Sequence, residues 1–337
     1  MPTPDTKRRI ADSNANTYVA NGVLAHEATK MAPPSFFEPF PSGSDTKITE
    51  RQSAVEKLLT GLLGKPRYSG PGFILFAHDC VDALNRISNS TLTLQLTVTS
   101  PPYNIGKEYE DIAGVDEYVN WCVEWMTLIH SATTENGSFW LNVGYLEVEN
   151  KGLCVPIPYL IWNISPFYFL QEVVWRYGAG VSTTKRLCPR NEKWLFYVKD
   201  ANNYVFNLDD IRDPNVKYPN QKRNGKFRCN PLGKNPSDVW DFPKVTTGSK
   251  RSSKERTAHP AQFPLPVVER VVKASSRVAD VILDPFAGSA SAGIAAAALG
   301  RVFIGFELRA DYCDLAAERF QRFWSLRTAA LSQSQLF

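Results

Sequence analysis

Cysteine and histidine are sparse and scattered in this sequence. Six cysteines and four histidines occur among 337 residues, and no two cysteines stand in C-x-x-C spacing. Disulfide frameworks and zinc sites both need such residues in close groups. The pattern therefore argues against a disulfide-stapled fold and against a bound metal.

Long hydrophobic runs are also missing. A membrane-spanning helix needs about 20 consecutive apolar residues, and no run in this chain is that long. The chain does not open with the regions of a signal peptide. We therefore expect an intracellular, cytoplasmic protein without a membrane partner. With 43% hydrophobic residues, the chain is able to bury one large α/β core plus a smaller attachment.

Two common phosphate-binding motifs are absent. The chain has no G-x-G-x-x-G, and its Gly64-Lys65 pair is followed by Pro66, which excludes a P-loop. A different nucleotide-binding pattern is present near the C-terminus. It consists of a strand pattern at 278–286, a small-residue turn at 287–293, a helix pattern at 294–299 and a strand pattern at 301–306. Glu307 follows, where an acid takes ribose hydroxyls in βαβ units. We predict an adenosine site without a phosphate cradle.

The turn at 99–104, Thr-Ser-Pro-Pro-Tyr-Asn, is the other unusual segment. It follows an apolar run at 92–98 that is typical of a buried strand, and neither proline is able to continue the ladder. The turn presents the Ser100 hydroxyl, the Pro101 carbonyl and the Tyr103 ring. These groups suit a planar base with an exocyclic amino group. For this segment alone, a structural Pro-Pro turn is the alternative.

Together these motifs resemble those of the DNA amino-methyltransferases. Residues 284–290 (D-P-F-A-G-S-A) resemble the family's cofactor motif, and residues 100–103 (S-P-P-Y) resemble its catalytic motif. Further similar stretches lie at 73–79, 192–199, 237–241 and 259–264. A catalytic motif that precedes the cofactor motif is the order of the permuted beta group. The resemblance implies an α/β, Rossmann-like methyltransferase fold, with an open, twisted, mostly parallel sheet, helices on both faces and an inserted basic target-recognition segment.

The resemblance also implies site residues. Ser100 and Pro101 would accept hydrogen bonds from the amino group of a flipped base, on which Tyr103 would stack, and Pro102 belongs to the same catalytic turn. The residues expected to bind the cofactor, S-adenosyl-L-methionine, are Asp79, His259, Phe263, Asp284, Phe286, Gly288, Ser289 and Glu307. The alternative for His259 is a structural histidine, and the alternative for Asp79 is the N-cap of a helix beginning near Val81.

Serine in the first catalytic position is usual for cytosine-N4 members of the family, and aspartate or asparagine for adenine-N6 members. We therefore expect methylation of cytosine N4 in double-stranded DNA, with adenine N6 as the alternative. Cytosine C5 methylation needs a cysteine nucleophile, usually in a Pro-Cys dipeptide, which this chain lacks. An RNA or protein methyltransferase and a non-catalytic DNA-binding protein on the same scaffold are further alternatives. The family also suggests a restriction-modification system with a separate restriction endonuclease.

One position departs from the family pattern. Ala290 stands where the cofactor motif usually has its last glycine. If this position has φ > 0, alanine costs about 1 kcal/mol or more. The neighbouring small residues Ser289, Ser291 and Gly293 keep the turn compact, so we expect cofactor binding to survive.

Positive charge is concentrated in one insertion. The net charge is only +4, but residues 212–256 hold 12 Lys and Arg against 4 Asp and Glu. A charge run is often only a solvated surface. Its place between the sheet and the cofactor motif, where permuted family members carry target recognition, favours DNA contacts. The residues predicted to bind DNA are Arg212, Lys222, Arg223, Arg228, Lys250 and Arg251.

These patterns predict five parts of the chain. They are an N-terminal arm with one helix (1–66), a catalytic half (67–200), a target-recognition insertion (201–257), a cofactor-binding half (258–326) and a tail (327–337). The helix expected at 46–63 would pack on the catalytic domain, contact DNA or dimerise. Asp79, Ser100, Asp284 and Glu307 all end strand patterns. Because ligands bind beyond the carboxyl ends of strands in open α/β sheets, we expect these four residues in one crevice.

Overall fold

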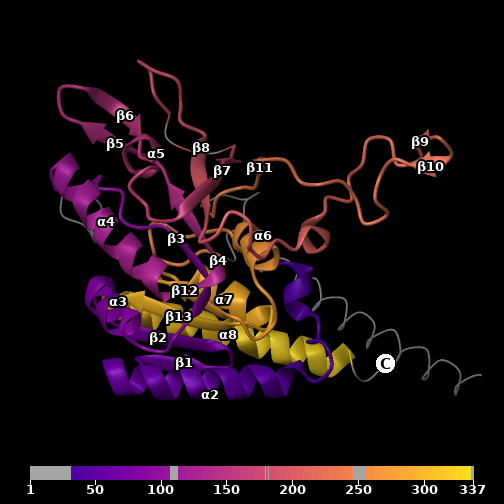
Figure 1. Ribbon diagram of the computed structural model, residues 1–337, viewed down its shortest axis with the longest axis horizontal. Helices are drawn as coiled ribbons and strands as arrows, with labels where there is room; N and C mark the ends of the chain where they lie inside the picture. Colours follow the sequence, from indigo (N-terminus) through magenta and orange to yellow (C-terminus); the bar gives the residue numbers. More distant parts are fainter. Residues whose placement is uncertain (1–31, 107–112, 179, 181, 246–254, 335–337) are drawn as a thin grey trace, which may run out of the picture.

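The computed structural model describes residues 32–106, 113–178, 180, 182–245 and 255–334. Its centre is a nine-stranded sheet of order β1-β2-β13-β12-β3-β4-β8-β7-β11 (Figure 1). In that order, the strands are β1 (Tyr68–Gly70), β2 (Phe73–Ala77), β13 (Val302–Glu307), β12 (Val281–Asp284), β3 (Leu94–Thr99), β4 (Thr133–Val143), β8 (Asn191–Val198), β7 (Tyr168–Arg176) and β11 (Val239–Asp241). Only β1 and β8 run antiparallel to their neighbours. The mostly parallel sheet confirms the predicted fold class.

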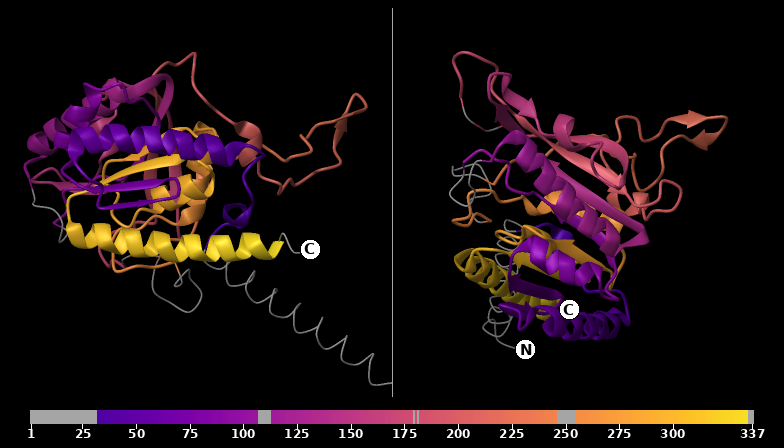
Figure 2. Two further views of the ribbon diagram at one scale, coloured as in Figure 1. Left: turned by 90° about the horizontal axis from the view of Figure 1, so that it is seen from below. Right: turned by 60° about the vertical axis from the view of Figure 1, so that its left-hand side comes forward.

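Helices cover both faces of this sheet (Figure 2). They are α2 (Ser44–Leu63), α3 (Cys80–Ser88), α4 (Val115–Ala132), α5 (Pro158–Ile161), α6 (Leu265–Ser275), α7 (Ser291–Ala298) and α8 (Ala310–Ser334). One core joins one face of the sheet to α6, α7 and α8, and a second core joins the other face to α2, α3 and α4. Alternate strand residues supply the two cores: Ile282 faces the first, whereas Val281 and Leu283 face the second.

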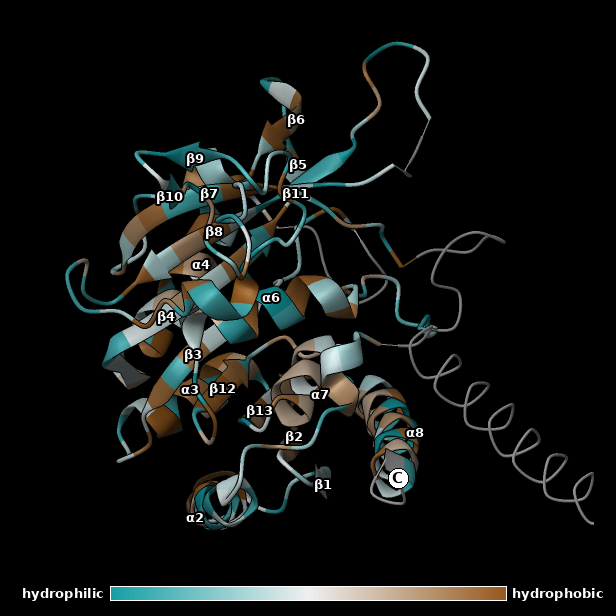
Figure 3. Cartoon of the chain, turned by 90° about the vertical axis from the view of Figure 1, so that its right-hand side faces the viewer, coloured by the Kyte–Doolittle hydropathy of each residue, from teal (hydrophilic) through white to brown (hydrophobic). Residues whose placement is uncertain are grey.

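The apolar composition of α7 follows from its position against the sheet (Figure 3). All of its residues are buried. A Cβ added at Gly293 would lie 2.3 Å from the Phe73 ring and 2.6 Å from the Phe303 ring. Only small side chains allow the helix to approach the strands this closely, which explains the alanine-rich sequence next to the cofactor turn.

The terminal segments pack on the same domain. Ile48, Val55 and Leu59 of α2 are buried, which confirms the packed-helix alternative for residues 46–63. Helix α8 continues through Ser334, past the boundary expected at residue 326. On its last turns Arg327 is buried and donates hydrogen bonds to the carbonyls of Phe36, in the short helix η1 (Pro34–Phe37), and Glu38. No helix in the described part of the chain is long and apolar enough to cross a membrane.

The sheet has two functionally different edges. We call the edge at which the parallel strands end the carboxyl edge, and the opposite one the amino edge. Because β8 is reversed, the chain that follows Val198 leaves from the amino edge. There the backbone N–H of Asn207 donates to the Ala274 carbonyl at the end of α6. The segment continues through η2 (Leu208–Ile211) to a protruding hairpin, β9 (Lys222–Arg223) and β10 (Lys226–Phe227), before it returns through β11 (Figure 1).

A smaller hairpin stands above α4 and α5. It pairs β5 (Tyr145–Val148) with β6 (Gly152–Pro156) directly after β4. The sequence of this region has no clear periodicity, and we did not expect strands here.

Candidate functional site

The catalytic turn leaves β3 at the carboxyl edge, as the sequence predicts. Ser100 Oγ donates to the Tyr103 hydroxyl at 3.0 Å, and that hydroxyl donates to Asn142 Oδ1 at 2.8 Å. Asn142 is fully buried at the end of β4, and its Nδ2 donates to the Lys193 carbonyl at 3.1 Å. Three side chains therefore form one hydrogen-bond chain that ends on backbone.

The direction of this hydrogen-bond chain follows from its last member. A backbone carbonyl only accepts, so it fixes the Asn142 amide with Nδ2 as the donor and Oδ1 as the acceptor. The Tyr103 proton then points to Asn142, and the Ser100 proton points to Tyr103. Consequently the lone pairs of Ser100 remain available to a donor, such as the N–H of an amino group.

The rest of the turn is held by side chains near α4. Tyr118 donates to the Pro102 carbonyl at 3.0 Å. Asn104 has φ +59° and makes two hydrogen bonds with the backbone of Ala113, at 2.8 and 2.7 Å. These contacts join the two sides of residues 107–112, which lie outside the described residues. The catalytic turn is thus rigidly attached before any substrate arrives.

The cofactor turn follows β12 at the same edge. Its Gly288 has φ +50° and donates its N–H to Glu307 Oε2 at 2.9 Å. A Cβ added at Gly288 would lie 2.7 Å from His259 Nε2, so a side chain there would displace the imidazole. Ala290 has φ +53° and precedes α7, so the unfavourable backbone conformation considered from the sequence is present.

Two acids lie on the neighbouring strands β12 and β13. Asp284 is buried, and its Oδ1 accepts hydrogen bonds from Thr99 Oγ1 at 2.5 Å and the Phe286 N–H at 3.1 Å. Burial raises the pKa of Asp284 to about 7, and no cation among the described residues offsets the loss of water. Burial also raises the pKa of Glu307, whose Oε1 accepts from the Arg309 N–H at 2.9 Å. A buried acid without a cation suits a ligand that carries an ammonium group.

Aromatic rings form one wall beside these acids. The Phe286 ring lies 5.4 Å from both Trp121 and Trp125, which come from α4. Trp125 is fully buried, whereas Trp121 and Phe286 are half-buried. The wall offers an apolar surface to a planar ring.

The comparisons with known proteins agree with this geometry. The sequence matches the family model described as DNA methylase over residues 94–318. The chain belongs to this DNA methylase family. The type II methyltransferase M.ScaI of Streptomyces caespitosus is 55% identical over 277 residues, which cover 81% of this chain and 90% of that protein. The DNA adenine methyltransferase YhdJ of Escherichia coli is 32% identical over 267 residues, which cover 75% of this chain and 84% of that protein.

A solved structure shares the fold of this methylase. It is the PvuII DNA methyltransferase described as cytosine-N4-specific, with a TM-score of 0.57 and 16% identity. The match covers 79% of this chain and 95% of that one. At this identity the likeness concerns the fold alone.

The remaining predicted cofactor residues of the methylase fall around the same edge, in different settings. Asp79 is exposed and caps α3, accepting from the Val81 and Asp82 N–H groups at 2.9 Å each, so the alternative to its predicted cofactor role, the N-cap, is present. Phe263 packs on Trp194 at 5.0 Å, and its carbonyl accepts from Ser291 Oγ. The described residues contain no group of three or more acids, histidines and cysteines that would hold a metal.

Sequence reasoning missed the arginine that holds the cofactor turn of the methylase. The side chain of Arg319 in α8 is only 10% exposed, and it donates from Nη1 to the Ser289 carbonyl at 2.8 Å and to Ser291 Oγ at 2.9 Å. Its Nη2 lies 3.6 Å from Glu255 Oε1. Burial lowers the pKa of Arg319 to about 10, and Glu255 partly restores it. An arginine in a long amphipathic helix gives no sequence signal of such a role.

The predicted DNA-binding residues of the methylase do not gather at this site. Arg212 donates to Asp209 at 2.6 Å and to the Gly233 carbonyl, so it braces the insertion internally. Lys222, Arg223 and Arg228 are exposed on or beside the β9–β10 hairpin, which projects from the amino edge. Lys250 and Arg251 lie outside the described residues. DNA binding by these residues stays a prediction, and the hairpin projects from the edge opposite to the one at which β3 ends.

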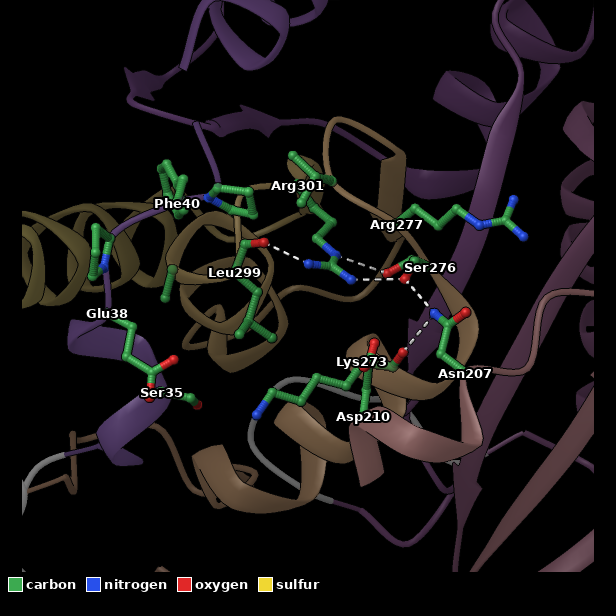
Figure 4. Close-up of a pocket in the computed structure, with 14 residues that line it drawn as sticks. Ser35, Glu38, Phe40, Asn207, Asp210, Lys273, Ser276, Arg277, Leu299 and Arg301 are labelled. Atoms are coloured by element: carbon green, nitrogen blue, oxygen red, sulfur yellow. Dashed lines mark hydrogen bonds between the residues drawn. The ribbon is translucent and has the colours of Figure 1, made fainter. Parts of the chain in front are cut away.

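A pocket of about 370 Å³ lies at the amino edge, away from the candidate site (Figure 4). Its wall includes Arg301, which is already bonded to the Leu299 carbonyl and to Ser276, and Lys273, which pairs with Glu269 at 2.6 Å. Because these two cations are matched within the protein and the acids Glu38 and Asp210 also line the pocket, it does not indicate an anion site.

Proposed function

We propose that this methylase transfers a methyl group from S-adenosyl-L-methionine to the N4 amino group of cytosine in double-stranded DNA. The observation that carries this proposal is the direction of the Ser100–Tyr103–Asn142 hydrogen-bond chain. It leaves Ser100 as an acceptor at the carboxyl edge, beside the Pro101 carbonyl. An exocyclic amino group offers the two N–H donors that such a pair of acceptors fits.

The cofactor is S-adenosyl-L-methionine. When bound, it supplies an electrophilic methyl group on sulfur. The unpaired, buried carboxyl of Asp284 suits the ammonium of the methionine moiety, and Glu307 suits the ribose hydroxyls. Phe286 and Trp121 offer a surface for the adenine ring. Gly288, His259, Phe263 and Ser289 shape the turn against which the cofactor would lie.

The residues of the chain would act on the target base by orientation. The amino nitrogen of cytosine is a weak nucleophile, because its lone pair is delocalised into the ring. Hydrogen bonds from both amino protons to Ser100 and Pro101 favour a geometry in which that lone pair is exposed. The base must first leave the duplex, and stacking on Tyr103 is worth about 1–3 kcal/mol. Alignment and exclusion of water then account for most of the rate.

The choice of base rests on Ser100 itself. Serine at this position favours cytosine N4, because it is the residue usual in the cytosine-N4 members that the catalytic motif resembles. The similarity to a protein named as a DNA adenine methyltransferase favours the alternative, adenine N6. Both bases present an amino group beside a ring nitrogen, so the base must be identified chemically.

The first experiment is mass spectrometry of nucleosides from mixed-sequence duplex DNA incubated with the protein and S-adenosyl-L-methionine. We expect N4-methylcytosine. Ser100→Ala should lower its formation at least about 100-fold, since it removes an interaction with the reacting group, while calorimetric cofactor affinity stays unchanged. Tyr103→Phe keeps the ring, loses the relay hydroxyl and should cost about tenfold. Ser88→Ala, at an exposed hydroxyl bonded only to the Asn85 carbonyl, is the control.

Each other outcome has a defined meaning. Detection of N6-methyladenine would agree with the proposed site but overturn cytosine as the target base. Absence of any methylated base, with cofactor binding intact, would overturn DNA as the substrate and favour an RNA or protein acceptor, or a non-catalytic protein.

We further propose that this methylation protects DNA against a separate restriction endonuclease, as the type II designation of M.ScaI suggests. DNA methylated by the enzyme should resist a nuclease that cleaves the same sequence. Cleavage at the normal rate after complete methylation would reject this role.

A further inference from the structure

We propose that the loop at residues 182–190 binds the duplex beside the target base, and that Leu187 enters the base stack when that base leaves it. The proposal rests on the proposed function, because a wedge is needed only if a base is flipped. It assigns a DNA-contacting surface outside the basic insertion that the sequence singles out.

The loop rises from the same edge as the catalytic turn. It connects β7 to β8, and Arg176 pairs with Asn191 where the two strands meet it. Strand β8 lies next to β4, which lies next to β3. At a spacing of about 4.8 Å per strand, the base of the loop is about 10 Å from the strand that carries Ser100. Figure 1 shows the loop extending beyond the ends of β7 and β8.

The base of the loop also adjoins the residues that support the catalytic turn. Lys193, at the start of β8, provides the carbonyl that orients Asn142. A Cβ added at Gly144 would lie 3.0 Å from the Tyr103 ring and 3.8 Å from Glu192 Cγ, so the glycine lets these two side chains approach. The loop and the catalytic turn therefore share one supporting layer.

The composition of the loop fits a nucleic acid partner. Leu187 is 93% exposed, more than any other exposed large hydrophobic residue of the described chain. Lys185 and Arg186, which precede it, are exposed, and residues 178–190 contain no acid. A single exposed leucine is ordinary on a protein surface. An exposed leucine next to two cations at the edge that receives the base is the pattern of an apolar wedge with phosphate contacts.

The loop is ordered by its own hydrogen bonds. Thr183 Oγ1 donates to the Arg186 carbonyl at 2.5 Å. At its base, the Tyr177 N–H donates to the Arg190 carbonyl at 3.0 Å. These bonds hold the segment before Leu187 in a turn, so less order has to be gained when DNA binds.

The experiment compares single-turnover methylation by wild type, Leu187→Ala and Leu187→Phe on a duplex that contains the methylated sequence. A wedge offsets unstacking of a few kcal/mol, so Leu187→Ala should lower the rate at least about tenfold, while duplex affinity changes less than about threefold. Leu187→Phe keeps an apolar wedge and should retain most of the rate. Leu153→Ala, 55% exposed on the β5–β6 hairpin, is the matched control and should behave as wild type.

A mismatched partner base separates flipping from folding. A target base that is already unpaired costs less to flip, so Leu187→Ala should recover to within about threefold of wild type on that duplex. 2-Aminopurine next to the target should brighten with wild type and not with Leu187→Ala on the matched duplex. A damaged enzyme would be slow on both duplexes, and that result would overturn the wedge.

Native cysteines give an independent test in the wild-type protein. Cys188 follows Leu187, and Cys229 lies beside the β9–β10 hairpin. Duplex DNA should slow maleimide labelling of Cys188 and leave that of Cys229 unchanged. Equal labelling of Cys188 with and without DNA would overturn the loop as a contact.

Failure of this proposal differs from failure of the proposed function. If wild type methylates DNA and Leu187→Ala does so at the same rate on matched duplex, only the wedge is wrong. If the wild-type protein methylates no DNA, the proposed function is wrong, and the proposed role of Leu187 is then wrong as well.

Discussion

Two alanines in the described part of the chain adopt backbone angles that favour glycine. Ala290, in the cofactor turn, has φ +53°, and Ala279, before β12, has φ +66°. Ala290 is fully buried, whereas Ala279 is half-buried. A comparison of substitutions at the two positions therefore distinguishes the cost of backbone strain from the contribution of one packed methyl group.

Replacing either alanine with glycine should raise the free energy of unfolding. The left-handed conformation costs alanine about 1 kcal/mol, so Ala279→Gly should gain about that much in urea denaturation. Ala290→Gly also loses a buried methyl worth about 0.8 kcal/mol, so its gain should be smaller. A loss of stability in Ala279→Gly would show that the strain is not real. Gly61→Ala makes the reverse exchange at an exposed helical position, and it provides the reference for a glycine–alanine exchange without a left-handed backbone.

The protonation of Asp284 should make cofactor binding depend on pH. Burial raises the pKa of this carboxyl to about 7 from an ordinary 3.8. Without cofactor, the folded protein keeps a proton that the unfolded chain loses near pH 4, so the free energy of unfolding falls as pH rises to about 7 and is constant above. An ammonium prefers the ionised form, so binding below pH 7 must release this proton.

We therefore expect S-adenosyl-L-methionine to bind about tenfold more weakly at pH 6 than at pH 8. Calorimetry in two buffers of different ionisation enthalpy would measure both the affinity and the protons released. Asp284→Asn should bind weakly at both pH values, with no proton release. An unchanged pH dependence in this variant would mean that Glu307, whose pKa is also raised by burial, is the titrating group instead.

At the scale of elements, helix α8 acts as a brace for the cofactor turn. Its Arg319 bonds the Ser289 carbonyl and Ser291 Oγ, while Glu255 balances the charge. Glu255 is itself buried, and its Oε1 accepts from the Leu265 N–H at 2.7 Å. The pair thereby joins α8, the cofactor turn and the start of α6.

Arg319→Met should destabilise the fold and weaken cofactor binding. Removing one partner of a buried ion pair costs about 3–5 kcal/mol, because the other charge is left unpaired. Thermal and urea unfolding would measure this loss, and calorimetry the affinity. Glu255→Gln in the Arg319→Met background should recover part of the stability but not the affinity, since the turn stays unbraced. Arg322→Met, at an exposed position of α8, should change neither.

Most elements near the site were predictable from the sequence, because each has a clear pattern of hydrophobic residues and a clear end. The acids and Ser100 do lie at or just after the ends of their strands. Asn142 was missed, although it too lies near the end of a strand, β4. The reversal of β8 was not predictable, because the buried run 194–198 of this strand reads the same in either direction. That reversal sends the basic insertion to the amino edge.

For the whole molecule, the consequence is that two basic segments lie at opposite edges. The loop at 182–190 stands on the carboxyl edge with Ser100, and the β9–β10 hairpin projects from the amino edge (Figure 1). The hairpin carries the larger positive charge, and for that reason the sequence predicts it as the DNA-binding segment. The distance of a segment from the reacting base depends on the direction of the strand before it, and a count of charges gives no information about that direction.

The salt dependence of duplex binding should rank these two segments. Each phosphate contact contributes about 0.9 to the slope of log affinity against log salt concentration. Lys185→Gln with Arg186→Gln should therefore reduce that slope by about 2, and Lys222→Gln with Arg223→Gln by less than 1. Fluorescence anisotropy over a salt series would measure both slopes, with the two double variants matched in charge. The opposite ranking would mean that the duplex reaches the amino edge, and the hairpin would then be its main contact.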